Sequence, residues 1–158
     1  MEIRAAVVTV SDTRGIGDDL SGNRLVELLT SIGAVILDRK IVNDNLEIVR
    51  DTIRSLVERD DIDLIITTGG TGFSPRDNTP EATQAVIERE APGLAEAMRR
   101  ETAKNHPMAM LSRGVCGIRG RTLIINLPGS PRGVEECFAV VSPVLQHAVD
   151  LISGDAAH

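Results

Sequence analysis

Three short runs that contain consecutive apolar residues constrain the fold of this chain more than any other feature. They are RAAVVTV at 4–10, DLIITT at 63–68 and TLIINL at 122–127. A strand with apolar residues at consecutive positions is expected where both faces of a sheet are covered. Helical patterns alternate with these runs; residues 21–32, for example, place leucine and isoleucine at i, i+3, i+4 and i+7. The alternation predicts an α/β fold with a largely parallel sheet.

The rest of the chain divides into further predicted elements, and its 158 residues suggest one domain, 1–158. Gly33 is placed to end the first helix in a left-handed conformation. Ser142-Pro143 resembles the start of the final helix, and residues 154–158 are expected to fray. The remaining predictions are a strand at 34–42, a helix at about 46–57, a helix from Thr79-Pro80 to about 90, a helix at about 94–104, and two or three short strands within 108–127 with a turn at 118–121.

Composition excludes several classes of protein. The net charge is −6, and the chain has two phenylalanines, no tyrosine and no tryptophan. A protein that coats nucleic acid phosphates, or stacks single-stranded bases, is therefore not expected. No apolar run approaches membrane-spanning length, and residues 1–4 lead directly into a strand without a signal peptide pattern. Cys116 and Cys137 lack metal or disulfide spacing and are interpreted as core residues. These features predict a cytoplasmic protein with no membrane or nucleic acid partner.

Four polar loops follow predicted strands, and the last two of them are rich in glycine. They occupy residues 11–14, 43–45, 69–77 and 128–133. If the strands are parallel, these loops meet at one edge of the sheet, where open α/β folds bind ligands. The segment 68–72 (TGGTG) carries backbone N–H groups that can face an anion, although it also fits a tight strand-to-helix turn. It matches neither a Walker A loop nor the dinucleotide fingerprint. We favour anion binding.

Carboxylates and arginines stand in the same loops. Asp44 and Asp77 are the strongest carboxylate candidates and Asp12 is a third, although each also fits a turn or a helix cap. Arginines hold phosphate oxygens in a bidentate fork, so clustered arginines favour a multiply phosphorylated ligand. The histidines share no metal spacing, and no Ser/His/Asp arrangement or nucleophile elbow is present. The four arginines in or beside these loops are Arg14, Arg76, Arg113 and Arg132.

Four runs carry a resemblance to a known family: TVSDTR (9–14), LIITTGGTGFSPRDNTPEAT (64–83), AMLSRGVCGIRGRTLIINLPGSPRG (109–133) and HAVDLISGD (147–155). Together they resemble the molybdenum cofactor biosynthesis proteins. The types that they are most similar to are the bacterial molybdopterin adenylyltransferases, the MoaB-type proteins and the gephyrin G domain. The resemblance covers essentially the whole chain. The sequence departs mildly from the family pattern: it lacks a proline just before Asp44, and it has Asn78 where a small apolar residue is common.

The resemblance implies a three-layer α/β/α domain with a mostly parallel sheet, assembled as a trimer, or as a hexamer in some MoaB-type members. It implies that Mg-ATP and molybdopterin are joined to give adenylyl-molybdopterin and pyrophosphate, and that a molybdate-insertion protein uses the product. The two essential aspartates of the family fall on Asp44 and Asp77, which we expect to hold Mg²⁺ or to orient phosphates. The ligand-binding positions implied are Ser11, Asp12, Gly69, Gly70, Thr71, Gly72, Ser112, Arg113, Pro128, Gly129, Ser130 and Pro131.

Two other functions compete with adenylyl transfer. A MoaB-type protein would bind molybdopterin or its adenylylated form without transferring AMP. A hydrolase that resembles the competence-damage-type domain would cleave a nucleotide pyrophosphate without a pterin. Retention of both Asp44 and Asp77 favours the adenylyltransferase, but only turnover separates the three.

Overall fold

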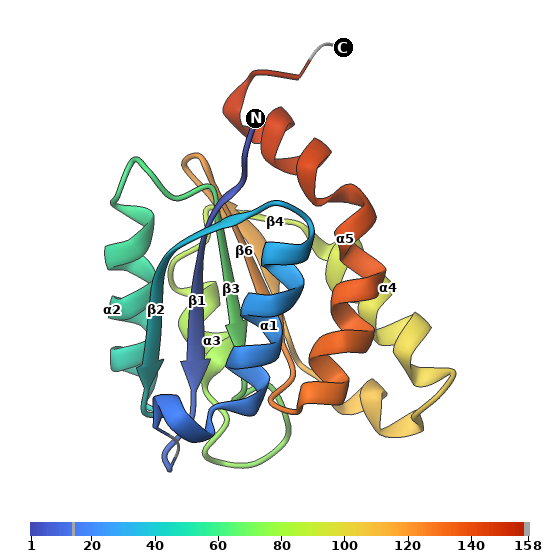
Figure 1. The fold of residues 1–158 in the computed structure, drawn as a ribbon. Coiled ribbons are helices and arrows are strands. Elements are labelled where there is room, and N and C mark those ends of the chain that lie inside the picture. Colours follow the sequence, from blue (N-terminus) through green and yellow to red (C-terminus); the bar gives the residue numbers. More distant parts are fainter. Residues whose placement is uncertain (14, 157–158) are drawn as a thin grey trace.

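The computed structural model describes residues 1–13 and 15–156, which form a six-stranded sheet with helices on both faces (Figure 1). The strand order is β2-β1-β3-β6-β5-β4. Four neighbouring strands, β2, β1, β3 and β6, are parallel, whereas β5 pairs antiparallel with β6 on one side and with the edge strand β4 on the other. The predicted α/β fold with a mostly parallel sheet is confirmed. The strands are β1 (Arg4–Val10), β2 (Val35–Val42), β3 (Leu64–Thr68), β4 (Arg89–Glu90), β5 (Cys116–Arg119) and β6 (Thr122–Leu127).

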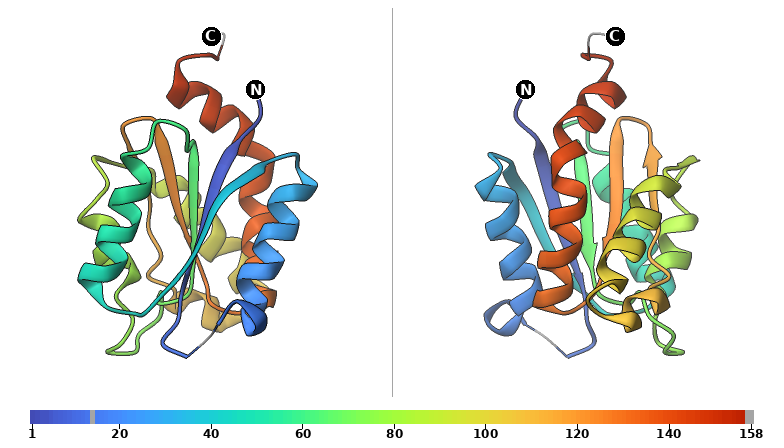
Figure 2. Two further views of the ribbon diagram at one scale, coloured as in Figure 1. Left: turned by 60° about the vertical axis from the view of Figure 1, so that its left-hand side comes forward. Right: turned by 90° about the vertical axis from the view of Figure 1, so that its right-hand side faces the viewer.

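The helices form the two outer layers. Helices α1 (Leu20–Ser31), α4 (Pro92–Ala103) and α5 (Pro131–Ser153) pack side by side on one face (Figure 2, right). The opposite face is covered by α2 (Leu46–Val57) and α3 (Thr79–Gln84). Two short 3₁₀ turns, η1 (Ile16–Asp18) and η2 (Pro107–Leu111), lie in the connections. The arrangement is the three-layer α/β/α domain that the resemblance implies.

Strand β1 shows why its sequence is apolar at consecutive positions. Successive side chains of a strand point to opposite faces of the sheet. Ala5 and Val7 belong to the core beneath α1, α4 and α5, whereas Ala6 and Val8 belong to the core beneath α2 and α3. All four side chains are fully buried. Both faces of the strand are therefore dry, which is the condition that the sequence pattern predicts.

The helix predicted from Thr79 to about residue 90 is shorter, and this prediction is wrong at its end. Helix α3 stops at Gln84, and Arg89–Glu90 pairs with β5 as the edge strand β4. The backbone N–H of Glu88 donates to Ile118 O (2.9 Å), which draws this segment to the sheet. Pro92 begins α4 rather than ending a helix, because proline fits the first helical turn.

The prediction that Ser142-Pro143 starts the final helix is also wrong. Helix α5 begins at Pro131, and the Ser130 side chain caps it by accepting a hydrogen bond from the Gly133 N–H (3.0 Å). The same serine-proline pair thus occurs twice, and only the first is a cap. Pro143 lies inside the helix, where a proline removes one backbone hydrogen bond and favours a bend. The region 108–127, predicted to hold two or three short strands, begins with the 3₁₀ turn η2 at 107–111, and the strands follow it.

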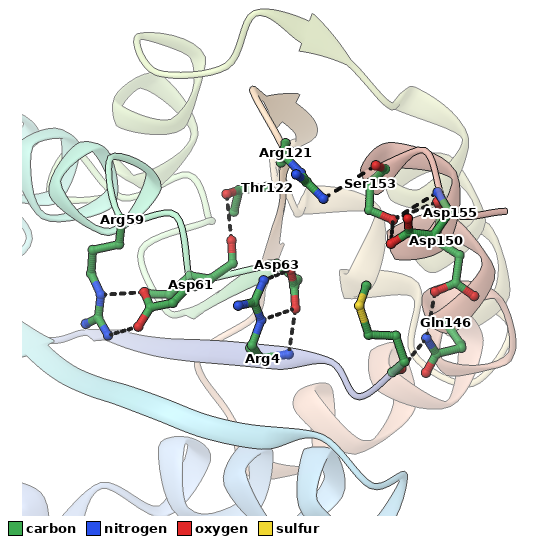
Figure 3. Close-up of polar contacts among 12 residues, drawn as sticks. Arg4, Arg59, Asp61, Asp63, Arg121, Thr122, Gln146, Asp150, Ser153 and Asp155 are labelled. Carbon is green, nitrogen blue, oxygen red and sulfur yellow. Dashed lines mark hydrogen bonds and ion pairs between the residues drawn. The ribbon is translucent and has the colours of Figure 1, made fainter.

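The amino-terminal end of the sheet is held by a separate set of polar contacts (Figure 3). Asp63 accepts three hydrogen bonds from Arg4, at 2.8 to 3.0 Å, and so ties β1 to the start of β3. Thr122 Oγ1 donates to Ile62 O (2.9 Å) and connects the start of β6. These contacts align the strands at the end away from the predicted ligand loops. Among the residues that the structure describes, no helix combines the length and the apolar character needed to cross a bilayer.

Candidate active site

The predicted meeting of loops at the carboxyl ends of the parallel strands is confirmed. The register places Thr9 of β1 beside Thr68 of β3, and Thr68 beside Leu127 of β6. The Thr68 hydroxyl donates to Pro128 O (2.7 Å), and the Gly69 N–H donates to Leu127 O (3.1 Å). The loops after β3 and β6 are therefore joined directly to each other.

The loop Gly69–Gly72 adopts a conformation that its glycines make possible. Gly69 and Gly70 have φ of +102° and +69°, a region that other residues adopt only with strain. A side chain at Gly70 would also meet Thr79 Oγ1 and Asp44 Oδ2. Thr79 Oγ1 donates to Gly69 O (2.9 Å), so the start of α3 braces the loop. The loop is thus both an anion-cradle candidate and a tightly packed turn.

The three aspartates come together beside this loop. Asp12 Oδ1 accepts from the Asp44 N–H, and Asp44 Oδ1 accepts from the Asn78 N–H, each at 3.0 Å. Asp77 Oδ2 accepts from the Ser74 N–H (3.0 Å) and lies next to Gly72. The functional and the turn-capping interpretations therefore coexist, because each aspartate uses one oxygen to order a loop.

Asp44 is the least solvated of the three. Its exposed fraction is 8%. Burial raises the pKa of its carboxyl above the usual value, and the charges of Asp77 and Asp12 raise this pKa further, which outweighs the lowering effects of the Asn78 hydrogen bond and the Arg76 charge. Negative charge therefore outweighs positive charge around Asp44, although Arg76 lies nearby.

The donor set fits a magnesium ion that is shared with substrate phosphates. Mg²⁺ in phosphoryl-transfer sites is typically held by one or two carboxylates, with phosphate oxygens and water completing its shell. Asp44 Oδ2 and Asp77 Oδ1 are not used in the loop-ordering hydrogen bonds described above. Within residues 1–13 and 15–156, no group of three or more His, Cys, Asp or Glu side chains could hold a metal ion alone.

The Arg113 side chain binds the protein's own loops. Its guanidinium donates from Nε to Gly72 O (2.8 Å), from Nη2 to Asp77 O (2.9 Å), and from Nη1 to both carboxylate oxygens of Glu81. Its backbone N–H also donates to Thr71 O (2.8 Å). The side chain expected to bind ligand is therefore committed to holding the segment that carries Asp77.

A cavity of about 400 Å³ opens on the other side of the Gly69–Gly72 loop, beneath α4, η2 and the start of α5. Five predicted ligand residues line it: Thr71, Gly72, Ser112, Pro128 and Ser130. Ser11, Asp12, Asp44, Gly69, Gly70, Asp77, Arg113, Gly129 and Pro131 are not among its lining residues. The candidate site thus has two compartments, an acidic one and a cavity, which share one glycine loop.

The four arginines have separate environments. Arg76 pairs with Asp12, and Arg132 pairs with Glu136 at the cavity. Arg113 is bound within the protein as described, and Arg14 lies outside the described residues. Arg132, whose side chain is 68% exposed, lines the cavity.

Sequence reasoning missed several residues of the site. Asn126 is buried and joins the layers: its Nδ2 donates to Thr67 Oγ1 and Thr83 Oγ1, each at 3.0 Å. His106 shares no metal spacing with the other histidines in the sequence, yet it lines the cavity with Glu136. No local pattern links these last two residues, which lie on different elements. A polar residue inside the apolar run 122–127 was the one available signal, and it marks Asn126.

Cys116 and Cys137 are buried free thiols, as predicted. Burial raises the pKa of the Cys116 thiol to about 12 and that of Cys137 to about 11. Both are therefore un-ionised at neutral pH, and Cys137 contributes a small apolar surface to the cavity.

The fold places both compartments at the carboxyl edge of a parallel sheet, which is where open α/β domains bind their ligands. The chain belongs to the family described as "Probable molybdopterin binding domain", which matches residues 6–147. It is 40% identical to a molybdopterin adenylyltransferase of Helicobacter pylori over 157 residues, 97% of this chain and 89% of the relative. It is 45% identical to the molybdopterin biosynthesis enzyme MoaB of Thermus thermophilus, a solved structure, with a TM-score of 0.89 over 96% of this chain and 97% of that one.

A longer relative contains the same domain. The chain is 43% identical to the molybdenum cofactor synthesis protein cinnamon of Drosophila melanogaster over 159 aligned residues. These residues cover 98% of this chain but only 26% of cinnamon.

Proposed function

We propose that this protein is a molybdopterin adenylyltransferase, which joins molybdopterin and Mg-ATP to give adenylyl-molybdopterin and pyrophosphate. The observation that carries the proposal is the pair of compartments joined by Gly69–Gly72: three aspartates on one side and a cavity of about 400 Å³ on the other. Two substrates that react through phosphates need such an arrangement, since their charged ends must meet while their organic ends stay apart. The kinship with the adenylyltransferase of Helicobacter pylori supports the same reaction.

The proposed reaction is an in-line displacement. A terminal phosphate oxygen of molybdopterin attacks the α-phosphorus of ATP, a P–O bond forms, and the bond to pyrophosphate breaks. The attacking group is already an anion at neutral pH, so the protein need not supply a strong base. Its task is to align the reactants and to offset their charge, which is the main contribution in phosphoryl transfer.

The chain's own residues divide this work. The Gly69–Gly72 backbone would receive the reacting phosphates, and Asp44 and Asp77 would hold Mg²⁺ through the oxygens that the loops leave free. Bound Mg²⁺ would offset the negative charge of the phosphate oxygens. Arg113 would keep the Asp77 loop in place through its bonds to Gly72 O and Asp77 O.

A product assay with a matched control tests the proposal. Purified protein is mixed with molybdopterin and Mg-ATP, and adenylyl-molybdopterin and pyrophosphate are both quantified. We expect equal amounts of the two products and a fall of about a hundredfold or more with Asp77→Asn, because such losses follow removal of a charge from a charge-dominated site. Asn at 77 can still accept from the Ser74 N–H, so the loop should keep its shape. Asp51→Asn, at an exposed aspartate of α2 that pairs with Arg50, should leave activity unchanged.

Each alternative gives its own result in this assay. Tight molybdopterin binding without adenylylated product would indicate the binding protein and contradict the proposal. Pyrophosphate or AMP released without a pterin would indicate the hydrolase. Full activity of Asp77→Asn would remove Asp77 from the mechanism.

We further propose that the protein works in the cytoplasm as a homo-oligomer, a trimer or a hexamer, and passes its product to a molybdate-insertion protein. Exposed apolar side chains on and near η2 support self-association: Met108 is 77% exposed and Met110 is 65% exposed. Such side chains gain from burial between subunits. Light scattering of the purified protein measures the mass of the assembly, and a monomer at working concentration would contradict this proposal.

A further inference from the structure

The α5 side of the cavity carries a carboxylate for which the proposed function gives no role. Glu136 lines the cavity, and its side chain is 23% exposed. Arg132 Nε donates to Glu136 Oε1 (3.2 Å), and His106 Nε2 lies 3.7 Å from the same oxygen. Within the described part of the chain, neither contact uses Oε2. Glu136 therefore brings to the cavity a carboxylate that can accept further hydrogen bonds.

His106 adds a second unused group at the same place. Its Nε2 atom is buried and has no hydrogen-bond partner among the described residues, and 3.7 Å is too long for a hydrogen bond to Glu136. A buried polar atom without a partner is unfavourable unless something else satisfies it. Arg99, a nearby arginine that also lines the cavity, is already committed, since its Nη1 donates to Gly114 O (2.8 Å) and toward Ser112 O.

The walls beside these polar groups suit a flat ring. Met98 and Ala95 of α4, Met108 of η2 and Cys137 of α5 all line the cavity. Thioether sulfur packs favourably against aromatic rings, and small side chains leave room for one. The cavity thus combines apolar walls with one acceptor and one unpartnered nitrogen, as in sites that orient a heterocycle.

We propose that Glu136 is the specificity-determining residue for the ring end of the organic substrate: its carboxylate receives the 2-amino group and the ring N3–H of a 2-amino-4-oxopyrimidine. His106 Nε2 lies beside it to meet the adjacent 4-oxo group. This inference rests on the proposed function for the identity of the ring, which is the pterin of molybdopterin. Adenine does not fit, because its amino group stands next to a ring nitrogen that is an acceptor and would face the carboxylate.

A titration with two fluorescent bicycles tests the proposal without turnover. Pterin carries the 2-amino group, and lumazine is the same bicycle with an oxygen in its place. We expect the protein to prefer pterin by about tenfold or more, because a site built to pair with an N–H group rejects the analogue that lacks it. Glu136→Gln should reduce the preference to within about twofold, since an amide can pair with either edge.

Matched variants separate specificity from folding. Glu135→Gln changes the neighbouring residue of α5, which pairs with Arg24 away from the cavity, and should keep the preference for pterin. Glu136→Asp keeps the charge but withdraws it by one methylene, so it should weaken pterin binding and retain the preference. Circular dichroism of each variant verifies that the fold is intact.

An unchanged pterin-to-lumazine ratio in folded Glu136→Gln would overturn the proposal. So would a rise in the KM for Mg-ATP, with that for molybdopterin unchanged, because the cavity would then hold the nucleotide. A chain that selects pterin through Glu136 but forms no adenylylated product would uphold this inference and refute adenylyl transfer. If the protein forms adenylyl-molybdopterin but the Glu136→Gln variant still prefers pterin to lumazine, adenylyl transfer would be upheld and the role of Glu136 refuted.

Discussion

Asp44 is held in the folded protein in an environment that disfavours its charge. Burial raises the pKa of this carboxyl, and Asp77 and Asp12 raise it further. An ionised carboxylate with a raised pKa makes the folded state less stable at every pH above that pKa. Such a residue is expected where charge serves binding or catalysis rather than stability.

Asp44→Asn should therefore separate stability from activity. The variant keeps an oxygen for the Asn78 N–H but removes the charge, so its unfolding midpoint should lie above that of the unchanged protein at pH 7. The gain should fade as the pH falls through the raised pKa and vanish below the ordinary value of 3.8, where both proteins are uncharged at this position. Adenylyl transfer should fall about a hundredfold or more. Thermal melts between pH 7 and about pH 3 measure the first effect, and a lower midpoint at pH 7 would contradict this explanation.

Among the elements, the connection from η2 to β5 controls the loop that carries Asp77. Arg113 lies in this connection and binds the loop through Gly72 O and Asp77 O, while Glu81 of α3 anchors its guanidinium. Three segments that are distant in sequence are thereby fixed to one another. The position of the loop that carries Asp77 therefore depends on Arg113 as well as on the residues of the loop itself.

Arg113→Lys should disturb the loop although the charge is kept. A lysine offers one nitrogen in place of a planar fork, so it cannot reach Gly72 O, Asp77 O and Glu81 together. We expect kcat to fall about tenfold to a hundredfold, because misplacement of catalytic groups by about 1 Å has effects of this size. Glu81→Gln removes the ion pair but leaves both bonds to the loop, and should lose much less. If Arg113→Lys raised only the KM for molybdopterin, Arg113 would be a ligand-binding residue instead.

The sequence predicts elements well where local chemistry is decisive and poorly where the same pattern has two uses. Consecutive apolar residues in β1 and β6 predict buried strands, and parallel strands in turn bring the four loops to one edge. The pair Ser142-Pro143 carries the same signal as Ser130-Pro131, and only tertiary packing decides that α5 runs through Pro143. For Arg113, sequence cannot tell whether the guanidinium faces a ligand or Glu81. His106 and Glu136 meet only because α4, η2 and α5 pack together.

At the scale of the whole molecule, the end of the sheet away from the candidate site depends on one nearly buried carboxylate. Asp63 is 6% exposed and is held by Arg4 (Figure 3). Burial alone would raise the pKa of Asp63, but the hydrogen bonds from Arg4 outweigh it and lower this pKa. A lowered pKa means that the ionised carboxylate stabilises the fold, fully above 3.8 and less as the pH falls through the folded-state value.

Asp63→Asn should lower the free energy of unfolding by about 2 kcal/mol at pH 7, since it weakens charge-assisted hydrogen bonds to a partly buried arginine. The deficit should narrow as the pH falls below 3.8, where the unchanged protein also loses the charge. Asp61→Asn is the matched control: the Asp61 side chain is 45% exposed, so solvent screens its pair with Arg59 and the loss of stability should be much smaller. Urea unfolding at neutral and acidic pH measures both variants, and equal losses would contradict a special role for Asp63.

Met1 and the end of α5 lie at this same end of the sheet, away from the ligand loops (Figure 1). The Gln146 side chain donates to Met1 O (2.8 Å), so the first residue rests against the last helix. A polypeptide appended at either terminus would extend away from the candidate site and leave its openings clear. The domain is thus built to tolerate covalent fusion, which agrees with the 26% share of cinnamon that it matches. In evolutionary terms, it can be inserted into a larger enzyme without redesign of its reactive edge.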